Sequence, residues 1–158
     1  TALEAVIHIQ SSKGEREVAI SDFFLLPGDT PEKETVLEPG ELITAVTLKP
    51  LPKGTRSHYL KLRDRASYEF AISSAAIVAT MNGGKIERIR IAMGGVGTKP
   101  WRSLEAEKML EGTQASEEKF KEAAAVFLRG AKPASENGFK LETAERCLVY
   151  ALKQATKA

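Results

Sequence analysis

The order of its hydrophobic patterns is the feature that most limits what this chain can fold into. Segments typical of β-strands come first, within residues 3–93, and segments typical of helices come last, from residue 103 onward. Strands that precede helices, instead of alternating with them, favour an α+β fold over a parallel α/β fold. The 158 residues are enough for one domain, or for a small domain with an extension from a neighbour.

The strand patterns are separated by turn signals. Leu3–Gln10 alternates between apolar and polar residues, and a turn at Ser12–Gly14 leads to a returning strand at Arg16–Ile20. Further strands are predicted at 42–48, 57–62, 73–81 and 86–93. The sequence Asn82-Gly83-Gly84 predicts that the last two form a hairpin.

Three helices are predicted in the C-terminal part. The first covers Ser103–Leu110 and is followed by Gly112, a residue that often ends helices. The second begins near Ser116 and carries apolar residues at helical spacing, and the third covers Glu142–Ala155.

A domain boundary is predicted where Pro50 and Pro52 interrupt regular structure in the segment Lys49–Gly54. We therefore expect two parts, residues 1–50 and 51–158. Thr1 begins almost directly in a strand-like pattern, which is the appearance of a chain cut from a longer one.

Charge and cysteine content exclude several functions. A net charge of +2 without a cluster of Lys and Arg gives no reason to expect nucleic-acid binding. No apolar run is long enough for a membrane span. The single cysteine, Cys147, allows no internal disulfide and no cysteine-based metal cage, and this agrees with a reducing cytoplasm. We interpret Cys147 as a buried, inert thiol.

Two segments have unusual composition. The loop Met93–Pro100 is rich in glycine but matches neither of the phosphate-binding motifs GxxxxGK(S/T) and GxGxxG. Its glycines are therefore interpreted as allowing close packing between a strand and a helix. Trp101 is interpreted as a packing residue, with an interface role as the alternative. The segment Tyr59–Ala71 concentrates charges between apolar anchors, and on composition alone it is a solvated segment with salt bridges.

Residues 60–76 (LKLRDRASYEFAISSAA) and 91–112 (IAMGGVGTKPWRSLEAEKMLEG) resemble the C-terminal domain of the FAD-binding subunits of molybdenum hydroxylases. This group includes xanthine dehydrogenases, carbon monoxide dehydrogenases and aldehyde oxidoreductases. Residues 22–50 are similar to the end of the preceding flavin-binding domain, and the wording PGDTPE is most similar to the aldehyde oxidoreductase type.

The resemblance implies a fold and a set of site residues. The expected fold is α+β, a three-stranded antiparallel sheet packed with a helical bundle, preceded by a short β-rich end of the FAD-binding domain in residues 1–50. Glu41-Leu42-Ile43 matches the family's motif Glu-(Leu/Ile)-(Ile/Leu), whose two apolar side chains flank the flavin. Lys61 matches a lysine that lies near the pyrimidine side of the flavin ring in some members of the family. An ammonium group there would raise the potential of the cofactor. Catalytic and metal-binding residues are not expected.

The resemblance also implies partners and a role. The complete subunit would bind FAD and assemble with a molybdopterin-binding large subunit and an iron–sulfur small subunit, in the cytoplasm or, for the aldehyde oxidoreductase type, the periplasm. The loops that hold the FAD pyrophosphate have no match in this chain, so we expect it to be inactive and without FAD by itself. The alternative is a non-catalytic interaction module that never contacts flavin.

Overall fold

The computed structural model describes residues 1–157, which form two compact units. The first unit contains residues 3–51 together with Thr1, and the second contains the chain from Pro52 onward together with Ala2. The connection between them runs through the two prolines of the segment 49–54, which contains no helix or strand.

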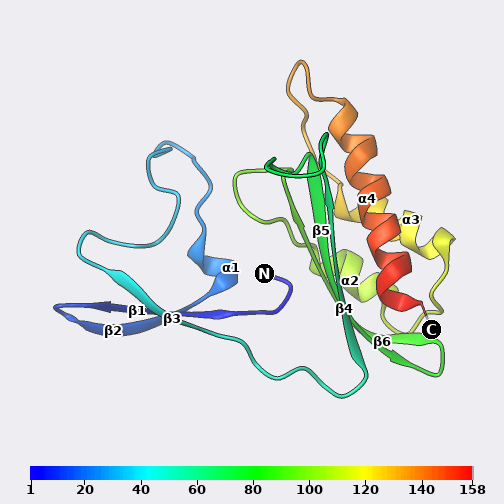
Figure 1. Ribbon diagram of the computed structural model, residues 1–158, viewed down its shortest axis with the longest axis horizontal. Coiled ribbons are helices and arrows are strands. Elements are labelled where there is room, and N and C mark those ends of the chain that lie inside the picture. The colour runs from blue at the N-terminus through cyan, green and yellow to red at the C-terminus, as the bar shows by residue number, and fades with distance from the viewer. Residues whose placement is uncertain (158) are drawn as a thin grey trace. The chain divides into compact units, whose positions relative to one another are not determined.

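The first unit is a three-stranded antiparallel sheet with one short helix (Figure 1). Its elements are β1 (Val6–Ser11), β2 (Gly14–Ala19), α1 (Ile20–Phe23) and β3 (Leu42–Thr47). Strand β1 lies in the centre, where Ile7 pairs with Val18 of β2 and Ile9 pairs with Ile43 of β3. A small core forms on one face from Ile7, Ile9 and Phe23, because alternate residues of a strand point to the same side.

The second unit contains a second antiparallel sheet, with the strand order β4-β5-β6. Its strands are β4 (Thr55–Leu62), β5 (Ser73–Asn82) and β6 (Lys85–Gly94). The predicted hairpin between β5 and β6 is present. Gly83 and Gly84 have φ values of +56° and +81°, which is the left-handed region that this tight turn requires.

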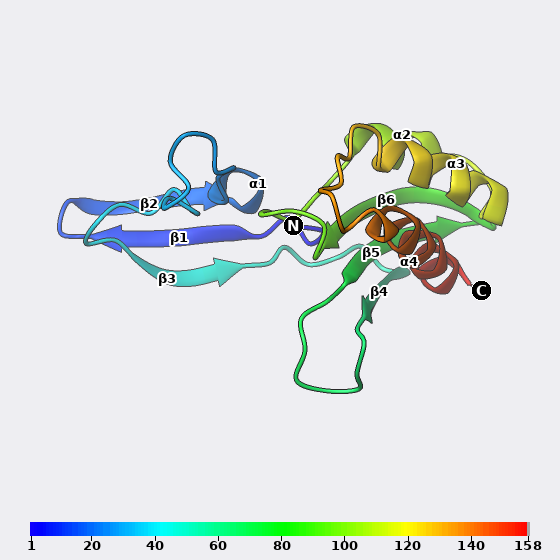
Figure 2. The ribbon, with the colours of Figure 1, turned by 90° about the horizontal axis from the view of Figure 1, so that it is seen from above.

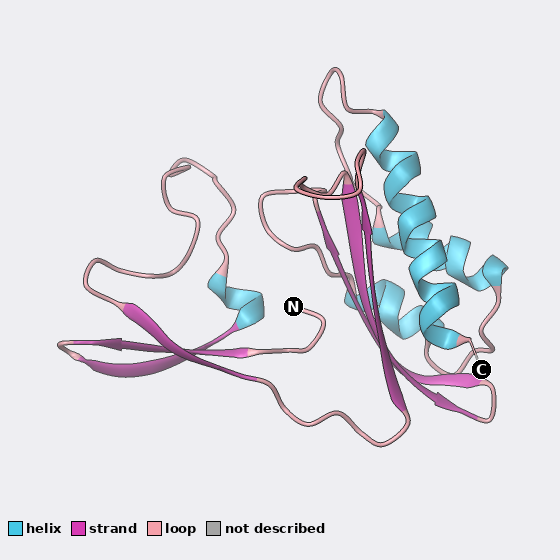
Figure 3. Ribbon diagram, viewed as in Figure 1, coloured by secondary structure: helices cyan, strands magenta, loops and turns pink. Residues whose placement is uncertain are grey.

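Three helices cover one face of this second sheet, as Figure 3 shows. They are α2 (Leu104–Leu110), α3 (Glu117–Phe127) and α4 (Phe139–Thr156). The hydroxyl groups of Ser103 and Ser116 accept hydrogen bonds from backbone amides in the first turns of α2 and α3, which fixes where these helices begin. The core lies between helices and sheet, and its largest fully buried side chains include Ile77, Ile86, Ile89, Ile91, Met93, Leu110, Leu148 and Leu152.

A β-bulge in β6 explains why the alternation of its sequence is imperfect. Thr80 pairs with Arg88 but Met81 pairs with Ile86, so Glu87 is an additional residue without a partner. Both Ile86 and Ile89 therefore face the core although three positions separate them.

The expected α+β fold, with a three-stranded antiparallel sheet packed by helices, is confirmed. The sequence did not predict α1, because four residues are too few to give a helical period. Helix α4 begins at Phe139, three residues before the predicted start. Within residues 1–157, no helix is both long enough and apolar enough to cross a membrane.

Candidate functional site

Leu42 and Ile43 open strand β3 at the edge of the first sheet. Their side chains are 72% and 47% exposed, although both are large and aliphatic. Consecutive residues of a strand point to opposite faces, so the pair presents apolar surface on both sides of this edge. Each side chain is therefore free to contact an apolar group, one from either face of the sheet.

Glu41, immediately before this pair, is held by Arg16 of β2. The Arg16 guanidinium donates from Nε to Oε1 of Glu41 at 2.8 Å and from Nη2 to Oε2 at 2.7 Å. Arg16 Nη2 also donates to the Val36 carbonyl at 2.8 Å, and Glu38 N donates to Glu41 Oε2 at 2.8 Å. A two-point contact of this kind fixes orientation as well as distance. The start of β3 is therefore positioned by a side chain from the opposite edge strand.

The same contacts control the ionisation of Glu41. The hydrogen bond from Arg16, followed by that from the Glu38 amide, lowers the pKa of the Glu41 carboxyl to about 2. The reciprocal hydrogen bond raises the pKa of Arg16. Both groups are consequently charged at neutral pH.

Lys61 lies on β4 of the second unit, on the face of the sheet away from the helices. Its neighbours Leu60 and Leu62 pack against the helical core, and alternation directs Lys61 and Tyr59 to the other side. Lys61 is exposed and pairs across the strands with Ser74. Its ammonium group has no hydrogen bond or ion pair with any of residues 1–157.

The charged segment after β4 forms a long loop that extends beyond the sheet (Figure 2). Arg65 and Glu69 form an ion pair at 3.7 Å, and Arg65 Nη2 donates to the Tyr68 carbonyl at 2.6 Å. Tyr68 has a φ of +53°, in the left-handed region that few residues other than glycine adopt. The side chains of Tyr68 and Phe70 are each 94% exposed.

The glycine-rich loop after β6 lies so close to its neighbours that Gly95 and Gly97 leave no room for a side chain. A Cβ atom at Gly95 would lie 2.8 Å from the Ala71 carbonyl oxygen, and one at Gly97 would lie 2.4 Å from Nε1 of Trp101. Trp101 is held by two backbone hydrogen bonds with Met93, both 2.9 Å long. The indole ring thus rests directly on the loop.

Cys147 lies in the core of the second unit and is 1% exposed. Burial raises the pKa of its thiol, which keeps it in the unreactive protonated form. Residues 1–157 contain no cluster of three or more His, Cys, Asp or Glu side chains that could hold a metal ion.

The predicted site residues divide between the two units. Leu42 and Ile43 belong to the first unit and Lys61 to the second. The role of Arg16 was not predicted, because its partner Glu41 is 25 residues away and the two meet only once β1 pairs with both β2 and β3. A lone arginine in a short edge strand gives no sequence signal for such a contact.

The protein is thus an α+β protein whose described residues contain no cluster that could hold a metal ion. It carries an exposed aliphatic pair at the edge of one sheet and, on the other sheet, a lysine that is unpaired within the same residues. Residues 58–155 match the model of the CO dehydrogenase flavoprotein C-terminal domain. Because this match covers more than half of the chain, the protein belongs to that family.

Known relatives agree with this assignment. The chain is 42% identical to the aldehyde oxidoreductase FAD-binding subunit PaoB of Escherichia coli, over 97% of this chain and 45% of the relative. It is 32% identical to the carbon monoxide dehydrogenase medium chain of Afipia carboxidovorans, over 85% of this chain and 44% of the relative. The chain spans about half the length of the curated relatives it matches.

Solved structures extend the likeness to the whole chain. A chain of the Cu,Mo-CO dehydrogenase in its cyanide-inactivated form superimposes with a TM-score of 0.88 at 30% identity, covering 98% of this chain and 54% of the other. The fold expected from the resemblance is therefore the fold of this family.

Proposed function

We propose that this chain is part of the FAD-binding subunit of a molybdenum hydroxylase, in which it supplies one side of the flavin pocket and a surface for subunit assembly. Support comes from the family membership and from relatives that are named as FAD-binding subunits or medium chains. The observation that carries the proposal is the exposed pair Leu42 and Ile43, which follows Glu41 and is positioned by the two hydrogen bonds from Arg16 to Glu41.

The side chains of this chain fit part of an FAD molecule. Leu42 and Ile43 offer apolar surface for a flat ring system and would exclude water from it. Bound FAD would accept two electrons and pass them on, with negative charge gathering near N1 and the C2 carbonyl on reduction. The pyrophosphate of FAD needs backbone amides that this chain does not provide in a recognised motif, so the strongest anchoring of the cofactor is assigned to the rest of the subunit.

Lys61 is proposed to tune the flavin. An ammonium group that has no anionic partner within the described residues can stabilise negative charge that develops nearby. That interaction would favour the reduced form and raise the potential of the cofactor.

The proposed partners are a molybdopterin-binding large subunit and an iron–sulfur small subunit. In this arrangement electrons pass from the molybdenum site through the iron–sulfur clusters to FAD, and the chain alone has no catalytic activity. We place the complex in the cytoplasm, with the periplasm as the alternative for a complex of the aldehyde oxidoreductase type; the single buried thiol, Cys147, is compatible with a reducing compartment.

The experiment that tests the proposal is FAD titration of the complete subunit, followed by flavin fluorescence. Leu42→Ala is expected to weaken binding roughly tenfold, since losing the burial of a side chain of this size costs about 1.5 kcal/mol. Val46→Ala is the matched control, because Val46 is an exposed aliphatic residue of the same strand at 55% exposure. Equal FAD affinity of both variants and the wild type would remove Leu42 from the site.

The alternative function is a pure interaction module without flavin contact. The exposed rings of Tyr68 and Phe70 on the loop after β4 favour it, since aromatic residues are enriched in protein interfaces. A complete subunit that assembles with its partners but never binds FAD would establish this alternative. Loss of assembly in Phe70→Ser with unchanged FAD affinity would instead give the loop the docking role within the first proposal.

A further inference from the structure

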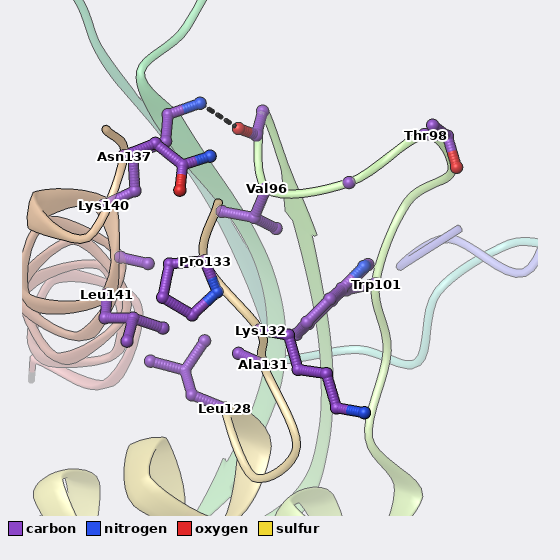
Figure 4. A pocket seen from close by; sticks show the side chains of 13 residues that line it. Val96, Thr98, Trp101, Leu128, Ala131, Lys132, Pro133, Asn137, Lys140 and Leu141 are labelled. Atoms are coloured by element: carbon purple, nitrogen blue, oxygen red, sulfur yellow. Dashed lines mark hydrogen bonds between the residues drawn. The ribbon is translucent and has the colours of Figure 1, made fainter. Parts of the chain in front are cut away.

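A cavity of about 350 Å³ opens in the second unit between three segments that are distant in sequence (Figure 4). The segments are the loop between β6 and α2, the loop between α3 and α4, and the first turns of α4. Its volume lies in the range of sites for small molecules. The aliphatic part of its lining consists of Val96, Leu128, Ala131, Pro133, Leu141 and Ala144.

The charged groups of this cavity are all positive. Lys132 and Lys140 line it at different ends, and no Asp or Glu is among its lining residues. Lys140 Nζ donates to the Gly95 carbonyl at 2.8 Å, and Lys140 also borders a neighbouring hollow lined by Asp64 and Glu69. Lys132 is exposed and has no hydrogen bond or ion pair with any residue that the structure describes. The ammonium group of Lys132 therefore has its three donors free to bind an anion.

Trp101 forms a fixed aromatic wall of the cavity. Two backbone hydrogen bonds to Met93 hold its main chain, and the indole Nε1 lies against Gly97, where no Cβ would fit. Figure 4 shows the ring between Lys132 and the loop that carries Thr98. A flat apolar body can stack on such a ring while an acidic group reaches the lysine.

We propose that this cavity binds a small organic anion, with a carboxylate or phosphate group at Lys132 and a flat, ring-sized body against Trp101. Neither Leu42, Ile43 nor Lys61 lines the cavity, so this proposal does not depend on the flavin contacts. The two kinds of acidic group share the same chemistry at the lysine, and the choice of probes separates them.

Trp101 supplies the measurement, because it is the only tryptophan of the chain. Its fluorescence is followed while the whole chain is titrated with phenyl phosphate and with benzoate. Inorganic phosphate tests the acidic group alone, and benzyl alcohol tests the ring alone. The expected result is saturable binding of phenyl phosphate or benzoate, at least tenfold tighter than of either isolated half.

Paired charge variants assign the site. Lys132→Gln is expected to weaken binding of the better probe roughly tenfold, the effect of losing one charge-assisted hydrogen bond. Lys85→Gln removes the same charge from the β5–β6 hairpin, away from the cavity lining, and is expected to bind like the wild type. Both lysines are exposed, so both variants should keep the wild-type urea midpoint.

Three outcomes would overturn the proposal. The first is the absence of saturable binding up to about 10 mM of either probe, which would leave the cavity without measurable affinity for both kinds of acidic group. The second is equal affinity of Lys132→Gln and Lys85→Gln. The third is equal affinity for inorganic phosphate and phenyl phosphate, which would mean that the ring contributes nothing.

Discussion

At the scale of single residues, the buried carboxylate of Glu107 joins α2 to the second sheet. It is 5% exposed and accepts hydrogen bonds from the Ile91 amide at 2.9 Å and from Arg102 Nε at 2.8 Å. Glu107→Ala leaves both donors without this partner in a desolvated place, so we expect a loss of about 3 kcal/mol in the free energy of unfolding. Urea unfolding followed by Trp101 fluorescence measures it.

Glu105, two residues earlier, gives the matched control for that measurement. Its side chain is 66% exposed and pairs with Arg129 at 3.0 Å. An exposed pair contributes less than about 1 kcal/mol, so Glu105→Ala should change stability little. Equal losses in the two variants would show that burial of Glu107 does not matter.

Lys61 carries a second prediction for a single residue, in the complete flavin-loaded subunit. Lys61→Met is expected to lower the flavin potential on the order of 30 mV, which corresponds to 1.4 kcal/mol for a two-electron couple. The cause is the lost attraction between the ammonium group and the negative charge of the reduced ring. Spectroelectrochemical titration measures the potential.

Lys85→Met is the control for Lys61, since it removes a lysine from the far end of the same sheet. It should leave the potential unchanged. If Lys61→Met also left the potential unchanged while FAD remained bound, Lys61 would have no electrostatic effect on the flavin.

At the scale of helices and strands, Glu117 connects α3 to α4. Lys153 Nζ of α4 lies 2.7 Å from Glu117 Oε2, and Lys121 Nζ lies 3.0 Å from Oε1. The hydrogen bonds from Lys153 and Lys121 lower the pKa of the Glu117 carboxyl to about 2, from 4.5 in the unfolded chain. A lowered pKa stabilises the fold above pH 4.5, and this contribution disappears as the pH falls through 2.

Glu117→Gln should therefore be less stable than the wild type at pH 7, and the difference should shrink between pH 4.5 and pH 2. Urea midpoints from Trp101 fluorescence across this range measure the difference. Glu118→Gln removes the adjacent carboxyl, which does not contact Lys153, and serves as the control. A difference that stayed constant over the whole pH range would contradict the assigned titration.

Elements set by local chemistry could be predicted from the sequence, and contacts set by distant segments could not. The hairpin follows from Asn82-Gly83-Gly84, and the starts of α2 and α3 follow from Ser103 and Ser116, because turn and cap residues act on their immediate neighbours. Leu42, Ile43 and Lys61 were nominated by resemblance, and their contact with flavin stays a prediction. The ion pair between Arg16 and Glu41 and the cavity at Trp101 depend on residues that only the folded sheets and helices bring together.

At the scale of the whole molecule, the two units differ greatly in the size of their cores. The first unit buries Ile7, Ile9 and Phe23 under a single short helix, while the second buries the inner face of its sheet beneath three helices. Unfolding free energy grows with the amount of chain that is packed, at roughly 0.05–0.15 kcal/mol per residue. The second unit should therefore be more stable by about 3 kcal/mol or more.

Hydrogen–deuterium exchange of the intact chain in increasing urea tests this difference. The amide groups of Ile7 and Ile9 should lose protection at lower urea than those of Ile77 and Ile91, because regions with fewer buried contacts open first. Trp101 fluorescence, which reports only on the second unit, should follow the later transition. A single urea midpoint for all four amides would mean that the units unfold together, and the small core of the first unit would then draw its stability from the second.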